Sequence, residues 1–299
     1  MAAVALSMRL GCWAKERWVQ AMKRPAAQKG ESPKRPRHGH ECGDTGPSRY
    51  AITFGEVALL HVGGKELGTL REKGFSVAEL RELASSLSGF RVELVMLSDA
   101  LPEKHRKENE AATLVIRNGA AAFLGGDAAQ KLLGEQQALK YDFKYWDARR
   151  SRTLNKRARY NLVFAEEGAQ PSADFKQYTV QAFGGLPHLA AFRAMLPQKL
   201  GEKARDLCAE GNHYFDESTG IGFHGDSERK IVVCLSLGRS SILRYCWRMP
   251  GSSTNGPPID IEIHHGDVYV MSEKATGFDW RSRSKVRVVH AAGSDKYIG

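Results

Sequence analysis

Short apolar segments separated by turns fill the C-terminal part of the chain, and they constrain its fold more than any other feature. They read IVVCLSL, SILRYCW, IDIEI, DVYVMS and VRVVH, and all lie between residues 231 and 290. Many short strands at regular spacing are typical of a β-barrel or a β-sandwich. The helical stretch PHLAAFRAMLPQKLGEKARDLCAE precedes them. The pattern predicts a jelly roll, also called a double-stranded β-helix, with supporting helices in a domain at residues 141–299.

A second pattern, at residues 49–140, alternates strand and helix signals. FRVELVML and ATLVIRNG are typical of strands, whereas DAAQKLLGEQQAL is typical of a helix. Ser76 and Glu79 form a capping box before the helical run ELRELASSL, because each side chain can bind a backbone amide of the first turn. The region predicts a small α+β domain of its own, so the expected fold class of the whole chain is α+β.

Residues 1–48 mix small, polar and basic residues without a hydrophobic period, which predicts a disordered basic tail. Two basic clusters, at residues 23–24 (KR) and 34–37 (KRPR), resemble a bipartite nuclear localisation signal. A solvated linker and an organellar transit peptide are the alternatives. We therefore expect a nuclear or cytoplasmic protein, with organellar import left open.

The composition is ordinary for a globular chain, since 42% of the 299 residues are hydrophobic and 26% are charged. No apolar run reaches the roughly 18 residues that a membrane-spanning helix needs, so no membrane association is expected. The five cysteines form neither a CxxC pair nor a disulfide framework, which indicates a reducing compartment. Cys234 and Cys246 lie in apolar runs, and we expect both to be core residues rather than nucleophiles.

The net charge of +10 is concentrated in two places. Residues 1–49 contain ten Lys or Arg against four acids, and residues 144–159 contain seven against one. The second segment also brings Tyr145 and Trp146 among its bases, with Tyr160 directly after it. Such a composition can neutralise phosphates and stack on nucleobases, although a charge run can equally be a solvated surface.

His224 and Asp226 stand two residues apart in GIGFHGDSERK, at the end of a strand-like run. Side chains two residues apart in an extended chain project to the same face, so the pair can bind one cation. His290 ends the strand-like VRVVH, and the intervening strands can return it to the same pocket. Two imidazoles and one carboxylate form the facial triad of non-haem Fe(II) oxygenases. His264 and His265 compete for the third position, but both precede a Gly-Asp turn, which favours His290.

GNHYFDESTGIGFHGDSERK, followed by VVCLSLG, IEIHHGDVYVM and VHAAG, resembles the core of the AlkB-like Fe(II)/2-oxoglutarate dioxygenases over about residues 155–292. The resemblance implies the jelly roll, an Fe(II) site made of His224, Asp226 and His290, and 2-oxoglutarate and dioxygen as co-substrates. The Asn-x-Tyr pattern of the family falls on Asn212 and Tyr214. By the same resemblance, these two residues help to bind the oxoacid.

The chain departs from the family after His290. Members place an arginine about fifteen or more residues beyond the last histidine, where it pairs with the far carboxylate of 2-oxoglutarate. In this sequence, Lys296 is the only basic residue after His290. The arginines nearest to His290, at positions 281, 283 and 287, precede it. The residue that holds this carboxylate is therefore open, and the alternatives are another basic residue, a missing strand or an impaired oxygenase.

The resemblance places substrate recognition just before the catalytic core, where the basic segment lies. It implies hydroxylation or oxidative demethylation of a modified base in DNA or RNA, flipped or single-stranded. A hydroxylase of a protein or small molecule on the same fold, and a non-catalytic nucleic-acid binding module that kept the jelly roll, are the alternatives. The candidate substrate-binding residues are Arg149, Arg150, Arg152, Lys156, Arg157 and Tyr160.

Overall fold

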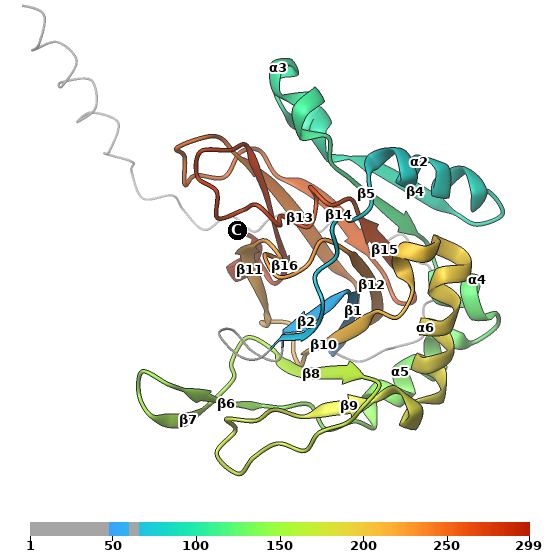
Figure 1. Cartoon of the computed structure of the whole chain (residues 1–299), viewed down its shortest axis with the longest axis vertical. Helices are drawn as coiled ribbons and strands as arrows, with labels where there is room; N and C mark the ends of the chain where they lie inside the picture. The colour runs from blue at the N-terminus through green and yellow to red at the C-terminus, as the bar shows by residue number, and fades with distance from the viewer. Residues whose placement is uncertain (1–47, 60–65) are drawn as a thin grey trace, which may run out of the picture. The chain divides into compact units, whose positions relative to one another are not determined.

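The structure of the protein is a computed structural model that describes residues 48–59 and 66–299. This part of the chain is mixed α and β, with most strands in two antiparallel sheets and a few helices (Figure 1). The predicted basic tail with its two clusters, apart from Ser48, lies outside the described residues. Within the described ranges, no helix combines the length and the apolar character needed to cross a membrane.

The larger sheet has eight strands in the order β4-β5-β15-β12-β1-β10-β8-β9. Its neighbouring strands are antiparallel except β8 and β9, which are parallel. The strands are, in that order, Val92–Met96, Ala112–Ile116, Val268–Met271, Val232–Gly238, Arg49–Gly55, Cys208–Tyr214, Tyr160–Ala165 and Val180–Ala182.

The smaller sheet has four strands in the order β11-β16-β13-β14. They are Gly220–His224, Arg287–Gly293, Ser241–Arg248 and Ile259–Ile263. Leu243 and Tyr245 of β13 belong to one buried cluster with Ala51, Cys234 and Tyr269 of the larger sheet. The two sheets therefore pack face to face, as in a sandwich.

Helices cover the other face of the larger sheet. They are α2 (Val77–Ser86), α4 (Gly119–Leu124), α5 (Ala128–Gln137) and α6 (Pro187–Leu200) (Figure 1). Ile52 and Phe54 of β1 pack in a cluster with Phe192 of α6, Leu132 of α5 and Leu80 of α2. Because side chains alternate along a strand, the remaining positions of β1 face the smaller sheet.

The prediction of a separate small domain at residues 49–140 is wrong. β1 lies in the middle of the larger sheet, where it pairs with both β10 and β12, and β5 pairs with β15. The described residues, 48–59 and 66–299, all belong to a single compact unit. The periodicity of residues 49–140 reveals the elements themselves, but hydrogen-bonding partners more than a hundred residues away leave no local signal.

Several local predictions are confirmed. Ser76 and Glu79 form both hydrogen bonds of the capping box at the start of α2. Cys234 and Cys246 are buried free thiols. The other short strands and α-helices of the described residues are β2 (Val57–Leu59), β3 (Glu66–Gly68), α3 (Glu103–Arg106), β6 (Lys144–Asp147), β7 (Arg152–Asn155) and α7 (Asp295–Ile298).

Candidate metal centre

His224 and His290 lie side by side because their strands pair. His224 is the last residue of β11, and the antiparallel register sets it directly opposite His290 of β16. The register shifts between Ile221 and His224, which is the sign of a β-bulge, a feature that often re-aims side chains beside active sites. Asp226 follows in the turn after β11, where its amide donates to the carbonyl of Thr276 at 2.9 Å.

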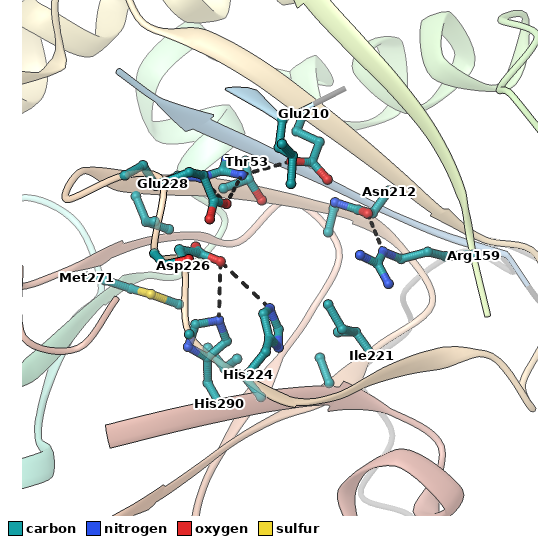
Figure 2. A pocket seen from close by; sticks show the side chains of 18 of the residues that line it. Thr53, Arg159, Glu210, Asn212, Ile221, His224, Asp226, Glu228, Met271 and His290 are labelled. Atoms are coloured by element: carbon teal, nitrogen blue, oxygen red, sulfur yellow. Dashed lines mark hydrogen bonds and ion pairs between the residues drawn. The ribbon is translucent and has the colours of Figure 1, made fainter. Parts of the chain in front are cut away.

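The three side chains converge on one point (Figure 2). Oδ1 of Asp226 lies 3.7 Å from Nε2 of His224 and 4.0 Å from Nε2 of His290. Both distances are too long for hydrogen bonds. They are within the roughly 4.2 Å that two metal–ligand bonds of about 2.1 Å can bridge. The described residues thus contain a group of ligand atoms, all within 4.8 Å of one another, that can hold a metal ion.

Both imidazoles are set up to act as neutral ligands through Nε2. Nδ1 of His224 is hydrogen-bonded to the carbonyl oxygen of Gly222 at 2.8 Å, which makes Nδ1 the protonated nitrogen and leaves the Nε2 lone pair free. Burial lowers the pKa of His290 well below its ordinary value, and the neighbouring His224 and Arg229 lower it further. Because a metal binds only the neutral ring, this low pKa suits ligation. Two imidazoles and a carboxylate suit Fe(II) with open positions for other ligands.

Gly225, between His224 and Asp226, allows a close chain crossing. A Cβ atom there would lie 2.7 Å from the indole ring of Trp280 and would collide with the carbonyl oxygen of Gly277. Gly277 itself has a φ of +71°. Any side chain at position 225 would therefore push the segment around Trp280 away from the loop that carries Asp226.

The centre opens into a cavity of about 780 Å³ between the two sheets. Asn212 and Tyr214 of β10 line it together with His224, Asp226 and His290. Oδ1 of Asn212 accepts hydrogen bonds from Nε of Arg159 at 2.6 Å and from Nδ2 of Asn161 at 2.7 Å. These two donors fix the amide orientation, so Nδ2 of Asn212 is the group left to donate to a ligand.

A buried ion-pair cluster lies beside Asp226. Nη2 of Arg229 is 2.8 Å from a carboxylate oxygen of Glu210 and 2.8 Å from one of Glu228. These carboxylates and Asp226 raise the pKa of Arg229 against the opposing effect of burial. The cluster joins the turn after β11 to β10, and it therefore holds the loop of Asp226 against the larger sheet.

Comparison with known proteins finds a viral relative of this chain. No family model matches the sequence. "Uncharacterized protein R156" of Acanthamoeba polyphaga mimivirus is 36% identical over 251 residues, which are 83% of this chain and 96% of the viral protein. The chain belongs to the family of this mimivirus protein. The name of the viral protein states no activity, so membership of this family does not assign a function to the chain.

Most of the basic segment, residues 144–159, lies outside the metal cavity, and of its bases only Arg159 lines that cavity. It forms a hairpin of β6 and β7, and several of its residues line a separate surface pocket: Tyr145, Arg150, Arg152, Lys156 and Arg157. Arg149 is exposed at the hairpin turn, outside both pockets. Tyr160 stacks on Phe215 with ring centroids 4.3 Å apart, so the structure gives it a packing role.

The two competing histidines are also outside the cavity. Nδ1 of His264 is 3.0 Å from Oγ of Ser240, and Nδ1 of His265 accepts from the amide of Gly238. Sequence reasoning missed other residues that line the cavity: Arg49, Thr53, Glu210, Arg229, Tyr269 and Trp280. The sequence contains a partial signal for the cavity residues of β1 and β10. Polar residues occur at alternate positions of RYAITFG and CAEGNHY, and alternate positions share one face of a strand.

Proposed function

We propose that the chain is an AlkB-like Fe(II)- and 2-oxoglutarate-dependent dioxygenase, with the two sheets as its jelly roll. The observation that carries the proposal is the convergence of His224, Asp226 and His290 at a cavity between two sheets. The sequence order of the three ligands and the strands between them agree with the resemblance to that family. Bound there, Fe(II) would supply the activation of dioxygen, with 2-oxoglutarate as the electron donor.

The residues around the metal have the chemistry that an oxoacid needs. Asn212 offers an amide donor whose orientation is fixed by Arg159 and Asn161. Tyr214, on the same face of β10, is 4% exposed. Apolar side chains such as Met271 and Ile221 also line the cavity and reduce the access of water (Figure 2). The protein would thus hold and orient the reactants, while the metal supplies the difficult chemistry.

The substrate we propose is a modified base in single-stranded or flipped DNA or RNA. The basic hairpin at residues 144–157 supports it, because its exposed arginines can neutralise phosphates. A cavity of about 780 Å³ has the size of typical small-ligand sites.

The proposal is tested by incubating the purified protein with Fe(II), 2-oxoglutarate and a panel of oligonucleotides that carry single methylated bases. We expect succinate release together with a mass change of one oligonucleotide, and neither in Asp226→Ala. Succinate without any oligonucleotide change would move the substrate to proteins or small molecules. Oligonucleotide binding without metal or 2-oxoglutarate binding would identify a non-catalytic binding module.

A further inference from the structure

Arg49, the first residue of β1, is a buried cation that lines the metal cavity. Its side chain is among the largest fully buried ones, and the whole residue is 2% exposed. Its guanidinium lies over the ring of Tyr214, 5.2 Å from the centroid, and Nε donates to Oγ of Ser236 at 3.5 Å. Nη1 is buried and makes no hydrogen bond. The ion pairs among residues 48–59 and 66–299 include none with Arg49.

An uncompensated cation inside a protein is costly. Removing a charge from water costs several kcal/mol unless an opposite charge or hydrogen bonds replace the lost solvation. A buried guanidinium with an unused N–H that lines a cavity therefore calls for an anion in that cavity. Arg is also the side chain best suited to carboxylates, because its planar fork matches their two oxygens.

The other arginines of the cavity are engaged or exposed. Arg229 already pairs with Glu210 and Glu228. Arg159 donates through Nε to Asn212. Arg281 is exposed, with its guanidinium 5.6 Å from the ring centroid of Trp280. Of the four arginines that line the cavity, Arg49 alone is both buried and without a carboxylate partner among the described residues.

We infer that Arg49 binds the far carboxylate of the oxoacid, beside Tyr214. The register supports the placement, because Arg49 is directly opposite Tyr214 in the pairing of β1 with β10. In this chain the anchoring cation thus comes from β1, near the start of the described chain, rather than from a strand after His290. Lys296, which does follow His290, is exposed and lies near the ring of Tyr297. The inference rests on the proposed function, since it assumes 2-oxoglutarate as co-substrate.

The test compares two oxoacids that differ only at the far end. 2-Oxoglutarate has a carboxylate there, and 2-oxovalerate has a methyl group on a chain of the same length. Anaerobic protein loaded with Fe(II) is titrated with each, and the dissociation constants are obtained by calorimetry for wild type, Arg49→Gln, Arg49→Met and Lys296→Gln. Fe(II) affinity is measured first in every variant, so loss of the metal site is separated from loss of the anchor.

We expect wild type and Lys296→Gln to prefer 2-oxoglutarate by about 100-fold, the effect of a charge-assisted hydrogen-bonded pair. The two Arg49 variants should bind both oxoacids within a few-fold of each other while keeping their Fe(II) affinity. An undiminished preference in Arg49→Met, or its loss in Lys296→Gln, overturns the inference and leaves the proposed function standing. Wild type that binds Fe(II) but neither oxoacid overturns both.

The Met variant also guards against a purely structural role of Arg49. Because Arg49→Met removes a buried charge without a partner and keeps an unbranched apolar side chain, we expect its ligand-free form to unfold at the same or a higher temperature than wild type. In the presence of Fe(II) and 2-oxoglutarate, wild type should unfold at a higher temperature than Arg49→Met, because ligand binding stabilises the wild type more. Equal destabilisation with and without ligand would assign Arg49 to the fold and not to the oxoacid.

Discussion

The metal centre and the basic hairpin (residues 144–157) are built in opposite ways. The candidate centre takes its three side chains from β11, β16 and the turn after β11, and these side chains are 7% to 27% exposed. The hairpin has two short strands that pair only with each other, and its arginines are mainly exposed. Convergent buried groups act as a unit, so one substitution can abolish their function, whereas exposed charges act additively and weakly.

Replacing one side chain of the candidate metal centre, in His290→Ala, should have the largest effect of the substitutions proposed here, and the effect is on Fe(II) affinity. Loss of a neighbour that merely orients a ligand already lowers metal affinity by about 10- to 100-fold, so loss of a ligand should lower Fe(II) affinity more than about 100-fold. Anaerobic titration calorimetry with Fe(II) measures it. His264→Ala, at an exposed histidine outside the cavity, is the control and should bind Fe(II) like wild type. Equal affinities in both variants would remove His290 from the site.

Lys156 is the exception within the hairpin, because its Nζ is buried without a hydrogen-bond partner, 5.7 Å from the ring centroid of Tyr178. Burial lowers the pKa of Lys156 from 10.5 to about 8. The unfolded chain therefore binds more protons between about pH 8 and pH 10.5, so the contribution of Lys156 to stability rises with pH in this window and is lost as pH falls through 8.

The variant Lys156→Met removes this buried cation. At pH 7 we expect the variant to be more stable than wild type by about 2 kcal/mol, a difference that shrinks toward pH 10. Urea unfolding at pH 7, 8, 9 and 10 measures it. If the stability difference between Lys156→Met and wild type does not change with pH, the ammonium group of Lys156 is solvated, like the exposed arginines of the hairpin.

Arg159 joins the two regions, since it follows the hairpin and donates to Asn212 in the cavity. Arg159→Gln should free the amide of Asn212 and weaken 2-oxoglutarate binding about tenfold, while Fe(II) affinity stays unchanged. A thermal-shift titration with 2-oxoglutarate on the Fe(II)-loaded protein measures the change. Arg157→Gln, two residues earlier and exposed, serves as the control. A similar loss in both variants would point to charge rather than to the hydrogen bond.

Single Ala substitutions of Arg150, Arg152 and Arg157 should have the smallest effects. Each should weaken binding of a single-stranded oligonucleotide only a few-fold and make the salt dependence shallower by about 0.7 per lost phosphate contact. Fluorescence anisotropy at several salt concentrations provides both quantities, with Lys104→Ala on α3 as an exposed control. Unchanged slopes in all three variants would exclude the hairpin from nucleic-acid binding.

The sequence predicted what depends on local pattern. The strand signals around His224 and His290 and the capping box of Ser76 and Glu79 are short-range, and the structure has the corresponding elements. It did not predict the place of β1 between β10 and β12, because strand pairing is set by packing between distant segments. For the same reason, Arg49 could not be connected with Tyr214. The charge run at residues 144–157 likewise did not reveal that one of its cations is buried.

The most direct test of the central claim is an anaerobic absorption spectrum of the purified wild-type protein after addition of Fe(II) and then 2-oxoglutarate. The account predicts a visible metal-to-ligand charge-transfer band that appears only when both are present and is absent in Asp226→Ala. A folded wild-type protein that shows no band under these conditions would contradict the assignment of His224, Asp226 and His290 as the iron site of a 2-oxoglutarate-dependent oxygenase.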